Sequence, residues 1–324
     1  MAEPSIEPAS RPLASIIVLN WNGREFLEKY LPHVVELTRA DDPGHEVILV
    51  DNGSTDGSVE LVRQAQPSVR LVTLSTNTGF SFANNRGAEV AVNPVIILLN
   101  NDVQPTPGFL APVLQHFRDP SVFAVAMKSL VPKRNNEEEA VRKLAFTRGW
   151  FQTESDPAVV AGRSEASPIL YACGGMVALH RDRYRELGGL DEMFSPIYWE
   201  DVDLSLRGWR RGWKVLYEPR SVVYHQHAST TARPDFRREA ALAALKNHHL
   251  LLWKHLDEAG PWLEYVFWQA VRLARSALTL DAVPFIALWR AFRQLDELRR
   301  GRARERAQSQ EGGVAVLRRH GAVK

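Results

Sequence analysis

The sequence has a single cysteine, Cys173, in 324 residues. One cysteine cannot form an intramolecular disulfide, and such scarcity is typical of proteins from reducing compartments. Residues 1–12 lack the apolar segment of a signal peptide, so we expect a disordered leader and no export signal. No run of 18 or more apolar residues is free of charges, so we expect no membrane-spanning helix. These absences favour a cytoplasmic protein.

A strong excess of one charge and the common glycine-rich phosphate loops are also missing. The formal net charge is only +2, which argues against a nucleic-acid partner. The first predicted strand is not followed by G-x-G-x-x-G, which argues against a dinucleotide-binding dehydrogenase. The G-x-x-x-x-G-K-[ST] loop of nucleoside triphosphatases is absent as well.

What is present is an alternation of apolar runs with segments of helical spacing. Runs at 14–19 and 95–99 are typical of strands buried in a sheet, and further strands are predicted at 46–50 and 69–74. Helical spacing between them predicts a parallel, doubly wound α/β sheet. Further strands are expected at 123–127, 170–179 and 214–217.

Polar side chains follow each of the first four strands. An Asx turn explains one such end, but four of them predict a polar rim along the carboxyl edge of the sheet, where α/β proteins bind ligands. A carboxylate beside amides also suits a hard divalent cation that carries phosphates. The residues of this rim are Asn20 and Asn22, Asp51 and Asn52, Asn77, and Asn101 with Asp102.

A second polar group lies farther along the chain. Glu200, Asp201 and Asp203 open a predicted helix, where the helix dipole favours one or two acids but explains three less well. The pair Gly174-Gly175 interrupts a predicted strand, which indicates the close approach of a ligand or of another stretch of backbone. His225 follows a strand, and most histidines in such places are structural.

Taken in order, these motifs resemble the inverting family 2 glycosyltransferases of the GT-A fold. The rhamnosyltransferase-like branch is the most similar, and the likeness covers about residues 13–255. It implies a Rossmann-like, mostly parallel sheet with flanking helices, and transfer of a sugar from a nucleotide donor with inversion. The matching segments are 15–23, 51–58, 77–87, 98–102, 173–179 and 198–207.

The resemblance implies a role for each matching position. Asp201 would be the general base with Glu200 beside it, and Asp102 and His225 would bind Mg²⁺ or Mn²⁺. The first acid of the family's D-x-D motif is replaced here by Asn100. The acceptor would lie near Trp199, Gly174 and Gly175. The nucleotide sugar would be bound by Asn20, Asn22, Asp51, Asn52, Asn77, Gly79, Asn85 and Asn101.

The same resemblance suggests rhamnose from dTDP-rhamnose as the transferred sugar, with a UDP-linked donor still open. The acceptor would be a hydroxyl of a cell-surface glycan or of a polyprenyl-diphosphate-linked glycan. One alternative is a sugar nucleotidyltransferase, but residues 20–23 lack the glycine-rich basic loop that such enzymes usually have. Another is an inactive nucleotide-sugar-binding module, which Asn100 supports and Trp199-Glu200-Asp201 opposes.

The chain divides on this basis into a catalytic domain at 13–232 and a helical extension at 233–307. The first half of the domain, 13–127, would bind the nucleotide sugar, and 128–232 would hold the acceptor and the catalytic groups. Residues 130–168 lose periodicity, which predicts a long functional loop near the acceptor. Residues 308–324 are expected to form a flexible tail.

The helical extension combines aromatic residues with many arginines. Such helices can lie in a membrane interface, here the cytoplasmic face of the inner membrane. They can equally form a hairpin that packs on the catalytic domain or on a second copy in a homodimer. The sequence leaves these two interpretations open.

Overall fold

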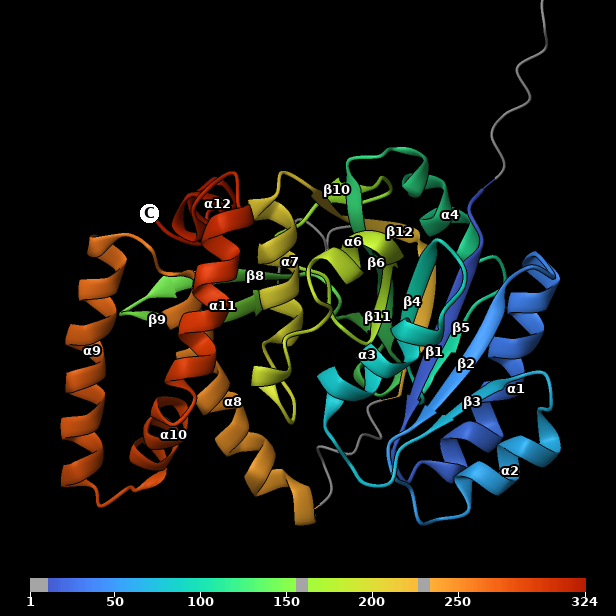
Figure 1. Cartoon of the computed structure of the whole chain (residues 1–324), viewed down its shortest axis with the longest axis horizontal. Helices are drawn as coiled ribbons and strands as arrows, with labels where there is room; N and C mark the ends of the chain where they lie inside the picture. Colours follow the sequence, from blue (N-terminus) through green and yellow to red (C-terminus); the bar gives the residue numbers. More distant parts are fainter. Residues whose placement is uncertain (1–10, 156–162, 227–233) are drawn as a thin grey trace, which may run out of the picture.

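The structure, a computed structural model, describes residues 11–155, 163–226 and 234–324. Within them a ten-stranded sheet forms the centre of the molecule (Figure 1). The strands are β1 (Ala14–Asn20), β2 (Glu46–Asp51), β3 (Arg70–Thr73), β4 (Val95–Asn100), β5 (Val103–Pro105), β6 (Val122–Val131), β7 (Glu137–Glu138), β10 (Ser167–Pro168), β11 (Met176–His180) and β12 (Lys214–His225). Their order is β10-β12-β6-β11-β4-β1-β2-β3, with β5 paired to β12 and β7 to β6.

The sheet is mostly parallel, as expected. β1 pairs in parallel with β2 and β4, β2 with β3, and β6 with β12. β11 is antiparallel to both of its neighbours, β4 and β6, which the sequence did not indicate. Since β1, β2 and β4 run in one direction, their polar carboxyl ends meet at one edge of the sheet.

Both faces of the sheet are covered by helices. In β4, Ile96 and Leu98 pack into one core while Val95, Ile97 and Leu99 pack into the other. Burial on both faces explains why the strand is a continuous apolar run without alternation. Helices α1 (Arg24–Asp41), α2 (Ser58–Ala65) and α4 (Leu110–Leu114) cover one face, and α3 (Phe80–Val90), α6 (Arg181–Glu186) and α7 (Glu200–Arg210) cover the other.

The division of the catalytic domain into two halves is wrong. The expected boundary between residues 127 and 128 falls inside β6, so both halves share one sheet. Residues 130–168 also contain more regular structure than expected. β8 (Arg142–Thr147) and β9 (Trp150–Ser155) form an antiparallel hairpin whose polar, exposed residues hid its strand pattern.

The C-terminal helices pack into the core of the catalytic domain, where Leu250, Leu251 and Leu252 are fully buried. The helices are α8 (Pro234–His255), α9 (Ala259–Leu278), α10 (Val283–Phe292), α11 (Leu295–Gln308) and α12 (Gly313–Arg319). None of the helices in the described ranges is long and apolar enough to cross a membrane. Most of the expected leader, residues 1–10, lies outside the described residues.

The expected flexible tail at 308–324 is wrong. Val314, Val316 and Leu317 of α12 are fully buried. The carboxylate of Asp257 accepts hydrogen bonds from the backbone N–H groups of Gly313 and Val314, at 2.7 and 3.0 Å, and so caps the helix. A helix of seven residues is too short to be recognised from its periodicity.

Candidate active site

The carboxyl ends of β1 and β2 carry a linked group of amide and carboxylate side chains. Asn20 Nδ2 donates to Asp51 Oδ1 at 3.0 Å, and Asn101 Nδ2 donates to Asn20 Oδ1 at 2.7 Å. Gly23 lies against this group, because a Cβ there would be 2.2 Å from Asn101 Nδ2. The predicted residues of the first, second and fourth strand ends are therefore brought together.

The loops that follow these strands continue the group. Asn52 Nδ2 donates to Asn77 Oδ1 at 3.0 Å and to the carbonyl of Gly79 at 3.2 Å. Asn22 Oδ1 accepts from the N–H of Thr55 at 2.7 Å. The side chains hold one another in fixed orientations, so the rim is preorganised for a polar ligand.

Asn85 does not join this rim. Its Nδ2 donates to the carbonyl of Leu190 and to Glu192 Oε1, and its Oδ1 accepts from the Tyr184 hydroxyl and the Leu190 N–H. All four hydrogen-bonding positions of the amide are used within the fold. The expectation that Asn85 contacts the nucleotide sugar is therefore corrected. Its side chain instead links α3 to the segment around Leu190 through hydrogen bonds.

The two predicted metal ligands lie side by side. His225, at the end of β12, places Nε2 at 3.3 Å from Asp102 Oδ1 and Nδ1 at 2.5 Å from Glu139 Oε1. Burial alone would lower the pKa of His225, but the hydrogen bonds to Asp102 and Glu139 outweigh it and raise the pKa to about 9. Glu139 was not recognised as a site residue, because it lies in the segment whose periodicity is lost. His227, the second histidine of this stretch, lies outside the described residues.

This pair can contribute to a cation site without completing one. Two ligand atoms at neighbouring corners of an octahedron, each about 2.1 Å from the cation, lie about 3 Å apart. The 3.3 Å between Asp102 Oδ1 and His225 Nε2 is close to that separation. Among the described residues, no group of three or more His, Cys, Asp or Glu side chains could hold a metal ion. A cation here would need further ligands, which the phosphates of a nucleotide and water can supply.

The two candidate catalytic acids have different surroundings at the start of α7. Glu200 is buried, and its Oε2 has no hydrogen-bond partner in the described residues. Burial raises its pKa, and the neighbouring charge of Asp201 raises it further. Asp201 is only partly buried, and its Oδ2 accepts from the N–H of Gly174 at 3.2 Å. Burial also raises the pKa of Asp201.

The glycine pair connects these acids to the strand that ends at Asn100. A Cβ on Gly175 would be 2.3 Å from Asn100 Nδ2, and a Cβ on Gly174 would be 3.4 Å from the Cβ of Asp201. The N–H of Asn100 donates to the carbonyl of Gly175 at 3.0 Å. The glycine pair was expected to interrupt a strand at 170–179, but it lies in the turn before β11, which begins at Met176. The close approach to Asn100 and Asp201 sets Asp201 beside the end of β4, next in the chain to Asn101 and Asp102.

Comparison with known proteins agrees with this arrangement. The model of the family described as glycosyl transferase family 2 matches residues 15–188, more than half of the chain. The chain belongs to glycosyl transferase family 2. It is 29% identical over 278 residues to an N-acetylglucosaminyl-diphospho-decaprenol L-rhamnosyltransferase of Mycobacterium tuberculosis, which covers 78% of this chain and 87% of that one. It is 28% identical over 220 residues to the pre-mycofactocin glycosyltransferase of the same species, which covers 67% and 44%.

Solved structures confirm the GT-A fold of this glycosyltransferase. GalNAc-T7, in a crystal structure with UDP, GalNAc and Mn²⁺, superposes with a TM-score of 0.63 at 17% identity over 90% of this chain and 57% of that one. A mannosyltransferase from Pyrobaculum calidifontis, in complex with GDP-Man and Mn²⁺, superposes with a TM-score of 0.54 at 18% identity over 98% and 81%.

The segment before α7 of the glycosyltransferase has an unusual backbone. Tyr198 and Trp199 both have positive φ angles, 81° and 76°, which cost aromatic residues free energy. Helix α8 holds them there. Asn247 Nδ2 donates to the carbonyls of Ile197 and Tyr198 at 2.9 and 3.0 Å, and Trp199 Nε1 donates to the carbonyl of Ala244 at 3.1 Å. Sequence reasoning missed Asn247, since nothing in a helical pattern marks one buried amide.

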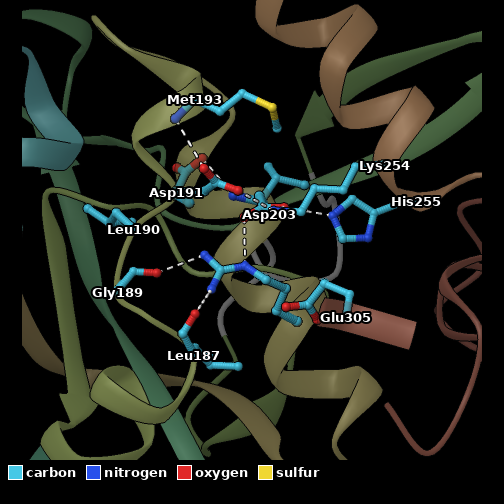
Figure 2. A network of polar contacts seen from close by, with 12 residues as sticks. Leu187, Gly189, Leu190, Asp191, Met193, Asp203, Lys254, His255 and Glu305 are labelled. Carbon is cyan, nitrogen blue, oxygen red and sulfur yellow. Dashed lines mark hydrogen bonds and ion pairs between the residues drawn. The ribbon is translucent and has the colours of Figure 1, made fainter. Parts of the chain in front are cut away.

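A buried ionic network holds the other side of α7 (Figure 2). Asp203 lies 2.7 Å from both Arg207 Nε and Lys254 Nζ and 2.8 Å from His255 Nε2, and Lys254 Nζ also lies 2.7 Å from Asp191. Burial alone would raise the pKa of Asp203, but the charges of Arg207 and Lys254 hold it well below its usual range. The third acid of the cluster is therefore structural. The spacing of Asp203 and Arg207, four residues apart on one helix, was the available signal.

Proposed function

We propose that this family 2 glycosyltransferase transfers its sugar with inversion, with Asp201 as the general base on the acceptor hydroxyl. Inversion needs one base on the face opposite the leaving nucleotide. The observation that carries the proposal is the contrast at the start of α7: Asp201 is only partly buried and lies beside Gly174, while Glu200 is buried. A raised pKa makes the Asp201 carboxylate a stronger base than an ordinary aspartate.

The donor would bind along the amide rim. Asn20, Asp51 and Asn101 would contact the base and ribose, with the loop at Asn77 and Gly79 beside them. Asp102 and His225 would hold a Mg²⁺ or Mn²⁺ ion, which when bound offsets the charge that develops on the leaving diphosphate. The Mn²⁺ of both structural neighbours supports this assignment, together with the UDP and GalNAc of one and the GDP-Man of the other.

The transferred sugar would be rhamnose from dTDP-rhamnose, and the acceptor a glycan linked to a polyprenyl diphosphate. The relative from Mycobacterium tuberculosis supports this choice, because its name gives rhamnose as the transferred sugar and N-acetylglucosaminyl-diphospho-decaprenol as the acceptor. It would place the reaction at the cytoplasmic face of a membrane. The family match favours glycosyl transfer over the alternatives of a sugar nucleotidyltransferase and an inactive binding module.

A donor panel tests the proposal. Thermal shifts would be measured with dTDP-rhamnose, UDP-linked sugars and GDP-mannose, each with Mn²⁺ and with EDTA, followed by detection of released nucleoside diphosphate. We expect the largest shift and the fastest release with dTDP-rhamnose. A larger shift with another donor would replace rhamnose as the sugar. Release of inorganic diphosphate when a nucleoside triphosphate and a sugar 1-phosphate are supplied instead would favour the nucleotidyltransferase.

A further inference from the structure

The exposed apolar side chains of this protein are gathered in one segment. Of the twelve large apolar residues that are exposed in the described ranges, ten lie between residues 263 and 292, on α9, α10 and the turn between them. The other two, Val92 and Tyr198, lie apart from each other in the sequence. Exposed apolar side chains gathered on two neighbouring helices and their connecting turn mark an interaction site.

Helix α9 forms most of this surface. It is 20 residues long, yet only Tyr265 and Gln269 are buried. At its end, Leu278 and Leu280 are 87% and 92% exposed, and both point away from any core. Figure 1 shows α9 at one end of the molecule, with its turn into α10 on the same side as the carboxyl ends of β1 and β2.

Positive charge accompanies the apolar side chains. Residues 259–293, which span α9, the turn and α10, contain four arginines, no lysine and two acidic residues, and α11 adds five more arginines. Arg275, near the turn, and Arg293 and Arg299, at and beyond the end of α10, are exposed. Apolar side chains with arginines beside them are the composition of helices that lie in the interface of an anionic membrane.

We propose that the surface formed by α9, α10 and the turn at 278–283 docks on an anionic phospholipid bilayer. The helices lie on the membrane, since none in the described ranges is long and apolar enough to cross it. A second copy of the chain fits this surface less well. A twofold interface sets the same patch against itself, so the exposed Arg275 and Arg293 and the net positive charge of residues 259–293 would face their own copies.

The docked orientation turns the carboxyl edge of the sheet toward the bilayer. A groove of about 490 Å³ also runs between α9 and the α10–α11 pair, lined mostly by apolar side chains that include Trp262, Tyr265, Leu273, Leu288 and Phe292. A hydrocarbon chain from the bilayer fits this lining. In this orientation a lipid-linked acceptor would reach Asp201, and this part of the inference rests on the proposed function. The docking itself is independent of the proposed function.

Co-sedimentation of the full chain with vesicles tests the docking. We expect binding to vesicles of equal parts phosphatidylglycerol and phosphatidylcholine, and little binding to phosphatidylcholine alone. The double variant Leu278→Ser/Leu280→Ser should bind at least tenfold more weakly, as should Arg275→Glu/Arg293→Glu. Val92→Ser, which alters an exposed apolar residue on another part of the molecule, serves as the matched control and should bind like the wild type.

Three results would overturn the proposal. The first is no binding of the wild type to the vesicles, and the second is equal binding by the double variant Leu278→Ser/Leu280→Ser and by Val92→Ser. The third is a wild type that light scattering shows to be a dimer and that the double leucine variant converts to a monomer. Release of nucleoside diphosphate in the presence of a detergent-soluble acceptor separates docking from catalysis. It should be unchanged in the leucine variant, whereas its absence in the wild type would contradict the proposed function alone.

Discussion

Asn247 offers the sharpest test of how the active-site loop is held. The two N–H groups of its side chain donate to the carbonyls of Phe194, Ile197 and Tyr198, and Asn247→Ala removes all of these contacts. Each buried hydrogen bond contributes about 0.5–1.5 kcal/mol net, so the loss is about 1–3 kcal/mol. A left-handed backbone conformation costs about 1–3 kcal/mol at each of Tyr198 and Trp199, which is similar to the free energy that the hydrogen bonds supply. The loop should therefore relax and move Asp201, which follows it directly.

Steady-state kinetics would measure the effect. We expect kcat to fall about tenfold to a hundredfold, because each 1.4 kcal/mol of the barrier is tenfold in rate, while the KM for the donor changes little. Asn93→Ala is the matched control: Asn93 is also buried and donates to the carbonyls of Ala14 and Gly44, at the opposite edge of the sheet. If both variants lose similar stability and neither loses kcat, the loop conformation does not position Asp201.

Four further predictions concern the site and its support. Asp203→Asn should lower the free energy of unfolding by about 3–5 kcal/mol, because buried Arg207 loses its ionised partner; urea denaturation measures this, and a change below 1 kcal/mol would contradict it. Gly175→Ala should lower kcat and cost about 1–3 kcal/mol of stability, since the new Cβ would overlap the Asn100 amide. Asp102→Ala should abolish the EDTA-sensitive part of donor binding in calorimetry; no EDTA effect on the wild type would remove the cation site. The rate should fall with falling pH as Asp201 becomes protonated. Because the pKa of Asp201 is raised, the midpoint of the pH–rate profile should lie above the ordinary aspartate value of about 3.9. A midpoint below that value would exclude Asp201 as the titrating base.

The sheet and the polar rim could be predicted because both depend on local pattern. Apolar runs such as the one before Asn100 identify strands, and the shared direction of parallel strands brings their polar ends together. The structure shows this directly for Asn20, Asp51 and Asn101. The close approach at Gly174 and Gly175 was also predicted, although the pair was expected inside a strand and lies in the turn before β11.

The support of the site could not be predicted, because it depends on contacts between distant segments. Asn247 lies about fifty residues beyond the loop whose carbonyls it holds, and Glu139 lies 86 residues before His225. A single buried amide or acid carries no periodic signal. Asn85 shows the opposite error. Because it lies in the expected motif, it was predicted to bind the ligand, although every hydrogen-bonding position of its amide is used within the fold. The short helix α12 was missed for lack of length.

The central claim is that Asp201, and not Glu200, is the general base. It is tested most directly by Asp201→Asn, with turnover measured as nucleoside diphosphate release and donor binding measured by calorimetry. We predict a loss of about 10²–10⁴-fold in kcat with donor affinity retained, and a much smaller loss in Glu200→Gln. Turnover at the wild-type rate in Asp201→Asn would contradict the account.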